Sequence, residues 1–392
     1  MSANVSDFDQ WIRTDFMHMN TELEELYFAQ HDRANVAGVG DNTKQKLHDE
    51  GKQYISRLLS EGNTDQGFDR GFDLLGNVGL YMAACGRHGI IDHLTESRSP
   101  LEEASALAMQ LGASLGVTPR FATSHLTTHN RAVNGRYKSF TTLDDDYIFT
   151  DYNTRSVLAY KRAADALLRI LPVGVSHPVA YDLLVAARDA LKDVVHYNRI
   201  LFEKLDTARF FYCVRPYFKP HRVGLHVYRG ANAGDFAGIN VIDMLLGLCH
   251  ADHAYYSQLL VDKFLYMMPE DQQVLRDCMR RKSLMSEFLE LSSDQHSTDW
   301  YRENLTLFLD VCEAHGETAA QHHDQLVSKF IAGPAENLDD KYEKNLTASG
   351  PPLPVLIASL EKLRDLRMAA PRDDIPSSYV QMQRLRDSLA PP

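Results

Sequence analysis

The chain has 392 residues, of which 44% are hydrophobic and 24% charged, and its formal net charge is −12. This composition is typical of a globular protein with a large core, and it argues against a disordered or fibrous chain. The acidic balance argues against a nucleic-acid partner, because binding to phosphates requires a concentrated basic surface.

The sequence carries no pattern of a membrane span or of a secretion signal. Its longest uncharged stretch is far shorter than a span, and its N-terminus lacks the basic and apolar pattern of a signal peptide. The five cysteines are scattered and never spaced C-x-x-C, which argues against a disulfide framework, a zinc ribbon or a covalently attached haem. We therefore expect a cytoplasmic protein with reduced thiols and no membrane partner.

The hydrophobic pattern is helical nearly throughout the chain. Residues 157–171 and 181–205 repeat apolar side chains at three and four positions, and so do residues 245–264, 305–312 and 326–331. Convincing alternating strands are missing. The pattern predicts an all-α, multi-helix fold with an N-terminal helical region over residues 1–110 and a helical domain over residues 111–392, together forming one continuous fold.

Three long segments do not fit the helical pattern. Residues 117–152 are rich in Thr and Asn and contain three consecutive aspartates, residues 216–240 contain four glycines, and residues 332–354 are rich in Gly and Pro. Long irregular connections in a globular protein are binding loops or lids, or they are disordered. For residues 332–354 the sequence leaves both a functional loop or lid and a disordered segment open.

The seventeen histidines direct attention to histidine chemistry, because the common nucleophile and phosphate-binding motifs and His-E-x-x-His are absent. His250 and His253 are three positions apart in a helical pattern, so both can face one metal ion, with Asp252 or Asp262 nearby. Spacing fixes no third ligand. Ordinary core or surface histidines are the alternative.

His323 has the surroundings that an axial haem ligand requires. In a helix it shares its face with Leu326, Val327 and Phe330, and two alanines lie on the preceding turn, whereas His322 points elsewhere. A neutral imidazole on an apolar helix face that excludes water and leaves space for a flat macrocycle can bind haem iron. The alternative is a hydrogen-bonded histidine of the core.

Arg215 follows Phe210 and Phe211 in the stretch RFFYCVRPYF. An arginine among aromatic rings can bind a carboxylate through two hydrogen bonds while the rings stack on a planar substrate. The alternative is a structural arginine that bonds to the last carbonyls of a helix before Pro216.

Several of these stretches resemble one family. Residues 209–215 resemble the distal-pocket helix of indoleamine 2,3-dioxygenase, residues 234–238 and 243–247 resemble its FAG and DxLLG signatures, and residues 323–331 resemble its proximal haem helix. The pattern RP-aromatic-aromatic-x-P-x-RVG in residues 215–224 is still more similar to the monodechloroaminopyrrolnitrin synthase branch of the same superfamily. The resemblance covers residues 205–332 firmly and residues 80–205 faintly.

The resemblance implies an all-α fold of the indoleamine 2,3-dioxygenase type that encloses haem b, with residues 111–392 as the haem-binding domain. It places the axial ligand on His323, the substrate ring beside Phe210 and Phe211, and the substrate carboxylate on Arg215. It implies an oxygenase, of the dioxygenase type, that acts with O₂ on ferrous haem and oxidises an indole or another aromatic amine or amino acid.

The chain departs from the family at the residue expected to contact a haem propionate. The family has an arginine in contact with a haem propionate three residues before the axial histidine, and this chain has Ala320 there. Arg222, Arg229 or Lys329 are the alternatives for that role. The substrate loop of the family corresponds here to residues 348–352, which contain two prolines.

Two further residues are assigned by the resemblance. Ser156 lies close to the position of the family's distal serine, and His125 falls where the branch has a histidine. His125, or His129 in the same segment, is expected either to donate a distal hydrogen bond or to hold that segment in place.

Two other functions remain alternatives. One is a haem-binding sensor or carrier without turnover, and the other is a non-haem metal-binding helical protein that uses His250 and His253. A homo-oligomer is compatible with the sequence but is not predicted by it.

Overall fold

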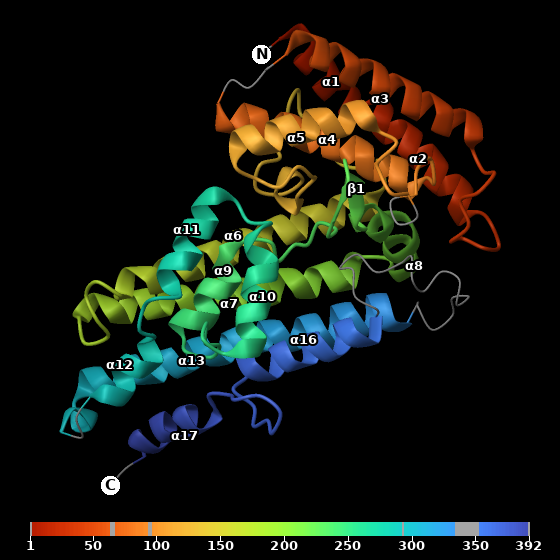
Figure 1. The fold of residues 1–392 in the computed structure, drawn as a ribbon. Helices are drawn as coiled ribbons and strands as arrows, with labels where there is room; N and C mark the ends of the chain where they lie inside the picture. The colour runs from red at the N-terminus through yellow and green to blue at the C-terminus, as the bar shows by residue number, and fades with distance from the viewer. Residues whose placement is uncertain (1, 63–66, 93–95, 292–293, 334–352, 391–392) are drawn as a thin grey trace. The chain divides into compact units, whose positions relative to one another are not determined.

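The computed structural model describes residues 2–62, 67–92, 96–291, 294–333 and 353–390, and helices dominate this part of the chain (Figure 1). The predicted all-α class is confirmed. The chain divides into two compact units, each built from three stretches. The first unit comprises Met1–Asp151, Lys204–Asp235 and Lys329–Leu353, and the second comprises Tyr152–Glu203, Phe236–Ser328 and Pro354–Pro392.

The first unit contains five long helices followed by short irregular elements. These are α1 (Ala3–Ile12), α2 (Asp15–Phe28), α3 (Asp41–Glu61), α4 (Phe68–Arg87), α5 (Glu102–Leu115), η1 (Thr123–His125), α8 (Thr207–Arg209), the π-helix η2 (Phe210–Val214), the 3₁₀ helix η3 (Arg215–Phe218), β1 (His221–Val223) and β2 (His226–Tyr228). Strands β1 and β2 form an antiparallel hairpin in which His221 pairs with Tyr228. The boundary predicted at residue 110 falls inside α5, and the assignment of haem binding to residues 111–392 stays a prediction.

Helix α4 lies at the centre of the first unit and packs against α1, α3 and α5. It is apolar and almost entirely buried because it is surrounded by other elements. Gly79 lets the chain approach α4 closely, since a Cβ atom there would lie 2.4 Å from the backbone nitrogen of Phe121. At Gly76 a Cβ atom would lie 2.5 Å from the ring of His125. The two glycines therefore create the space that residues 121–125 occupy.

The second unit is a bundle of longer helices. Its elements are α7 (Pro178–Lys204), α9 (Ala237–Leu245), α10 (Ala254–Phe264), α11 (Pro269–Cys278), α12 (Leu284–Glu290), η4 (Gln295–Ser297), α13 (Asp299–Gln321), α16 (Leu353–Arg367) and α17 (Tyr379–Ser388). Most of α6 (Asp144–Ile170) and the start of the π-helix η5 (His322–Ala332) also belong to it. In α7, Ala180, Leu184, Ala187 and Leu191 are buried at spacings of four and three, which gives the helix one apolar stripe toward the core.

Two sequence expectations need correction. The irregular segment predicted for residues 117–152 ends at residue 143, because Asp144, Asp145 and Asp146 form the acidic first turn of α6, where carboxylates stabilise the helix dipole. The helical pattern of residues 245–264 is also interrupted. Gly247 adopts a left-handed conformation (φ 72°), and the amide of Leu248 donates to the carbonyl of Asp243, which ends α9.

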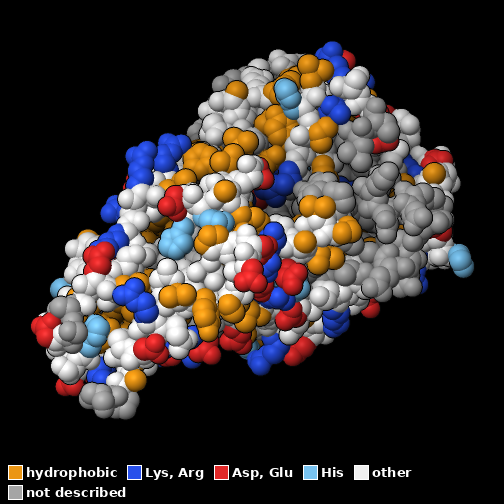
Figure 2. All heavy atoms as spheres, turned by 60° about the horizontal axis from the view of Figure 1, so that its bottom comes forward, with side chains coloured by type: hydrophobic (Ala, Val, Ile, Leu, Met, Phe, Trp, Pro, Cys, Tyr) orange, Lys and Arg blue, Asp and Glu red, His pale blue; other side chains and the backbone are white. Residues whose placement is uncertain are grey.

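No helix among the residues with described coordinates has the length and apolar character needed to cross a membrane. On the face shown in Figure 2, acidic and basic side chains are interspersed.

Candidate active site

The first group of predicted site residues lies on one short segment of the first unit. Phe210 and Phe211 are on η2, and Arg215 begins η3. The segment starts at a capped turn, because the Asp206 carboxylate accepts a hydrogen bond from the Arg209 amide at 2.7 Å. π-helical turns are rare in proteins, and those that occur are often found at functional sites. The structure therefore brings Phe210, Phe211 and Arg215 together in the first unit.

An aromatic cluster of the first unit surrounds this segment. Phe210 contacts Phe149 at 5.1 Å and Phe330 at 5.9 Å between ring centroids, and Phe218 contacts Phe149, Phe121 and Phe140 at 5.6 to 5.7 Å. Edge-on and tilted ring pairs of this kind fix side-chain orientation as well as burying apolar area.

Arg215 is almost entirely buried, with 6% of its surface exposed. Its guanidinium carbon lies 5.7 Å from the centroid of the Phe211 ring. Burial lowers the pKa of Arg215 to about 10, because the charged form loses its hydration. A carboxylate placed against Arg215 would compensate for this loss, so the side chain fits the predicted contact with an acidic substrate group.

A buried ion pair that the sequence did not reveal holds this segment. Arg87 of α4 donates two hydrogen bonds to Glu24 of α2, at 2.8 and 2.7 Å, and a third to the backbone carbonyl of Tyr212 in η2 at 2.9 Å. Both side chains are at most 4% exposed. Because the partners are 63 and 125 residues away from Arg87, no local sequence motif could predict the contact.

Lys219, which directly follows η3, is a second group that sequence reasoning missed. Burial, together with the nearby cations Arg87 and Arg215, lowers its pKa to about 7 against the opposing effect of Glu24. This end of η3 is therefore a place where a negative charge would be stabilised.

His125 is buried within the first unit, in the space provided by Gly76. Its ring stacks on Phe72 with 3.9 Å between centroids, and its Nδ1 lies 2.9 Å from the Ala122 amide. Its Nε2 has no partner of hydrogen-bond geometry among the residues with coordinates. Burial lowers the pKa of His125 to about 3, so the imidazole is neutral at physiological pH.

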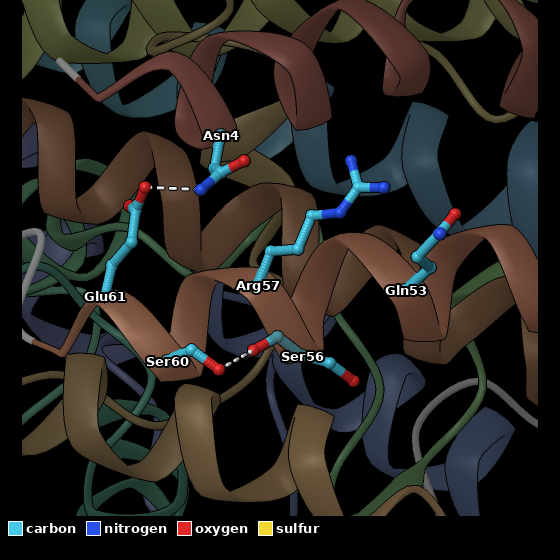
Figure 3. Close-up of a pocket in the computed structure, with 6 residues that line it drawn as sticks. All are labelled: Asn4, Gln53, Ser56, Arg57, Ser60 and Glu61. Carbon is cyan, nitrogen blue, oxygen red and sulfur yellow. Dashed lines mark hydrogen bonds between the residues drawn. The ribbon is translucent and has the colours of Figure 1, made fainter.

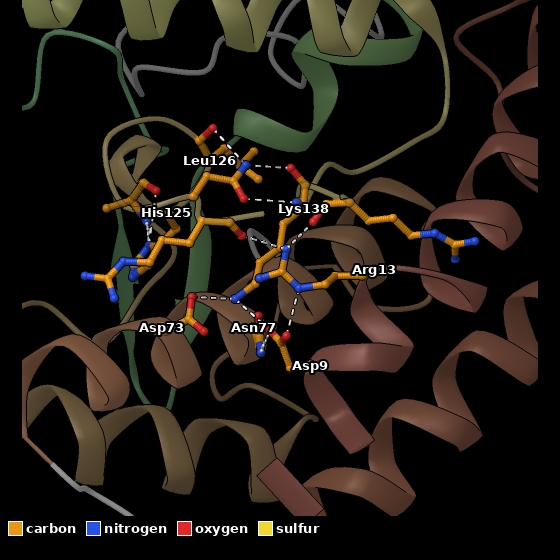
Figure 4. Close-up of polar contacts among 11 residues, drawn as sticks. Asp9, Arg13, Asp73, Asn77, His125, Leu126 and Lys138 are labelled. Carbon is orange, nitrogen blue, oxygen red and sulfur yellow. Dashed lines mark hydrogen bonds and ion pairs between the residues drawn. The ribbon is translucent and has the colours of Figure 1, made fainter. Parts of the chain in front are cut away.

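The segment that carries His125 is fixed by a polar network (Figure 4). The Lys138 ammonium is 2.6 Å from the Asp73 carboxylate and 2.9 Å from that of Asp9, and Arg13 pairs with Asp9 at 2.7 Å. Arg13 also donates to two backbone carbonyls of residues 131–136. Burial would raise the pKa of Asp9, but Lys138 and Arg13 outweigh it and hold the pKa below its usual value.

Arg222 lies on the hairpin, and its guanidinium donates to the Leu225 carbonyl at 2.7 Å. It also lies 3.4 Å from the Ser97 carbonyl. These bonds stabilise the turn between β1 and β2. These bonds do not test the predicted contact between Arg222 and a haem propionate, which stays a prediction.

Ser156 and His323 belong to the second unit. Ser156 on α6 is buried, and its hydroxyl donates to Asn198 of α7 at 3.1 Å. His323 lies one residue inside η5, so its surroundings follow π-helical spacing rather than the α-helical spacing that the sequence predicted. The side chains of Leu326 and Val327, predicted to share its face, lie outside the described residues.

The imidazole of His323 has the two features of a metal-binding histidine. Its Nε2 is buried and has no hydrogen-bond partner among the described residues. Its Nδ1 is 2.9 Å from Oδ1 of Asp324 and 3.2 Å from a guanidinium nitrogen of Arg364 on α16. An imidazole with one nitrogen engaged and the other unpartnered fits an axial haem ligand.

A buried cluster of the second unit supports the elements near His323. Asp243 of α9 accepts bonds from Arg367 of α16 at 2.8 Å, from His315 of α13 at 2.7 Å and from Tyr256 of α10 at 2.7 Å. Burial would raise the pKa of Asp243, but Arg367 and His315 hold it well below its usual value. One carboxylate therefore joins four helices.

His250 and His253 do not share a helix. Both lie in the turn between α9 and α10, because Gly247 ends α9 before them. In the part of the chain with coordinates, no group of three or more His, Cys, Asp or Glu side chains could hold a metal ion.

Two surface hollows of the first unit contain none of the predicted site residues. One lies between α1 and α3, where Asn4 donates to Glu61 and Ser60 donates to the Ser56 carbonyl (Figure 3). The other is lined by residues of α3, α4 and the start of α5, including His48 and Tyr81.

Comparison with known families covers nearly the whole chain. The family described as "Monodechloroaminopyrrolnitrin synthase PrnB" matches residues 2–389. A search of curated protein sequences finds no match. The match includes the residues before 80, where the sequence shows no motif of the family. The chain belongs to the monodechloroaminopyrrolnitrin synthase PrnB family and is an enzyme of its haem-dependent oxygenase class, which acts on an aromatic amino-acid derivative.

Proposed function

We propose that the protein is a haem b oxygenase of the dioxygenase type, in which His323 binds the haem iron through Nε2. The observation that supports this proposal most directly is the buried Nε2 of His323, which has no hydrogen-bond partner among the described residues, while Nδ1 is engaged on the other side of the ring. Membership of a haem-dependent family supports haem as the cofactor. The substrate proposed is an indole or another aromatic amine or amino acid.

When bound, haem supplies the chemistry of dioxygen, which no side chain of the candidate site provides. The side chains bind and orient the substrate. Phe210 and Phe211 offer rings for stacking and exclude water, and Arg215 pairs with the substrate carboxylate. The low exposure of Arg215 favours this role, because a buried cation gains most from a carboxylate partner.

Three further residues have smaller proposed roles. His125, neutral at physiological pH, would donate a hydrogen bond from Nε2 to a molecule bound in the haem pocket. Ser156 would act only as an acceptor toward the substrate, because its hydrogen is donated to Asn198. Arg222 would bind a haem propionate in addition to the Leu225 carbonyl, since a guanidinium has five N–H donors.

The visible spectrum of protein supplied with haem tests the axial ligand. We expect the Soret band to be lost in His323→Ala and kept in His322→Ala, because adjacent helical residues point in different directions. His322→Ala is the matched control, since it removes the same group one position away. Equal retention of the band in wild type and both variants would contradict the assignment.

Ligand binding tests Arg215 separately. Arg215→Ala should weaken binding of indole-3-carboxylate about tenfold or more, the loss expected for one charge-assisted pair. Binding of indole, which has no carboxylate, should change little. If Arg215→Ala leaves indole-3-carboxylate binding unchanged, the carboxylate contact is wrong.

A further inference from the structure

We infer that Asp324 and Arg364 control the tautomer of His323, and with it the ability of Nε2 to bind a metal. This inference rests on the proposed function, because it concerns the residue proposed as axial ligand. Both are positioning residues that act through the imidazole.

The geometry at Nδ1 of His323 presents two opposing partners. Asp324 Oδ1 lies 2.9 Å away and can only accept, whereas the Arg364 nitrogen lies 3.2 Å away and can only donate. A neutral imidazole carries one hydrogen. If it is on Nδ1, Asp324 accepts it and Nε2 keeps the lone pair that binds iron. If it is on Nε2, Nδ1 accepts from Arg364, and that lone pair is lost.

Asp324 and Arg364 also interact with each other. Arg364 NH1 lies 3.6 Å from Asp324 Oδ1, and the same guanidinium bonds to Asp365 at 2.9 Å. Arg364 therefore has a carboxylate partner of its own. This engagement reduces its competition for Nδ1 and leaves Asp324 as the acceptor for His323.

The buried cluster around Asp243 fixes the spacing of these groups. Arg367, three residues after Arg364 on α16, and His315, eight residues before His323 along α13 and η5, both bond to Asp243. The helix that carries Arg364 and the one that leads to His323 are thus held to the same carboxylate. This shared attachment holds Arg364 and His323 near each other.

The two partners should affect bound haem in opposite directions. A carboxylate that accepts the Nδ1 hydrogen increases electron donation from the imidazole and favours the ferric state, whereas a cation beside it favours the ferrous state. Because the Asp324 side chain is 62% exposed, water competes for it. We therefore expect a moderate effect from each substitution.

The first experiment uses the full chain without haem, labelled with ¹⁵N on histidine. The His323 signal is assigned by its loss in His323→Ala. We expect the wild type to carry its hydrogen on Nδ1, Asp324→Ala to shift it to Nε2, and Arg364→Met to keep it on Nδ1. Glu313→Gln, an exposed charge change on α13, is the matched control and should leave the signal unchanged. The same tautomer in wild type and Asp324→Ala would overturn the inference.

The second experiment measures the midpoint potential of the haem-loaded protein. Asp324→Asn should raise the potential and Arg364→Met should lower it, each by up to a tenfold change in the reduction equilibrium, or about 59 mV. Shifts of the same sign, or none, would overturn the inference. Failure of the proposed function is distinguishable, because it would appear as a Soret band retained in His323→Ala, whatever the haem-free tautomer.

Discussion

His125 shows how burial sets the charge of a single residue. Its pKa of about 3 in the folded chain lies below the value near 6.5 of an unfolded histidine. Between these pH values the unfolded chain binds more protons, so stability is lost as the pH falls through that window. His125→Phe removes the titrating group and keeps a flat ring against Phe72.

We predict that wild type loses about 2 kcal/mol more stability than His125→Phe between pH 6.5 and pH 5. Urea unfolding at both pH values measures this difference. The exposed His18→Gln variant serves as control and should behave as wild type. If wild type and His125→Phe lose the same free energy of unfolding between pH 6.5 and pH 5, the assigned burial of His125 is wrong.

Lys219 is a second base with a lowered pKa, and its effect has the same sign at higher pH. Its pKa of about 7 in the folded chain lies below that of an unfolded lysine, so the unfolded chain binds the extra proton between pH 7 and about 10.4. Stability should therefore rise with pH across that window. We predict that Lys219→Met is more stable than wild type at pH 6 and that the difference shrinks by pH 9.5, as measured by urea midpoints. A difference independent of pH would refute this.

At the scale of elements, Gly79 determines how closely residues 121–125 approach α4. A Cβ atom there would meet backbone, which cannot rotate away. We predict that Gly79→Ala costs about 1–3 kcal/mol, the usual penalty of overpacking, despite the gain in helix propensity. Gly76→Ala, which meets the side chain of His125 rather than backbone, should cost less. Chemical denaturation compares both with Gln53→Ala on the exposed face of α3, and a neutral Gly79→Ala would rule out the close approach.

The pair Glu24–Arg87 connects three elements through one guanidinium. Arg87→Met leaves the Glu24 carboxylate buried without its partner and should cost about 3–5 kcal/mol. The double variant Glu24→Gln/Arg87→Met should cost less than the sum of the single variants, because no charge is then left buried. A double-mutant cycle by urea unfolding measures the coupling, and strict additivity would exclude a direct pair.

At the scale of the whole molecule, the proposed cofactor should stabilise the folded chain. A ligand that binds only the native state at a free concentration 100 times its Kd adds about 2.7 kcal/mol. We predict that haem raises the thermal midpoint of wild type and of His322→Ala but not of His323→Ala. Thermal unfolding followed by circular dichroism tests this, and the same rise in all three proteins would argue against His323 as the ligand.

The sequence by itself determined the helical class, because apolar residues at spacings of three and four place one apolar face on a helix and recur along most of the chain. It also predicts His323 rather than His322 as the haem ligand, and this choice stays a prediction. The trio Phe210, Phe211 and Arg215 could be named from one short stretch, and the structure places the three on adjacent elements. Gly247 is the local signal for the end of α9, but the apolar repeat continues across it and predicts an uninterrupted helix there.

Tertiary structure alone decided the partners of these residues. Arg364 reaches His323 from 41 residues away, Arg87 reaches Glu24 from 63, and Arg367 reaches Asp243 from 124. Such contacts form because packing of the apolar faces brings distant polar groups to the same buried place, where each must find a partner or lose its hydration energy. The sequence could name the residues with the chemistry, and only the folded chain could set the hydrogen bonds and pKa values that govern it.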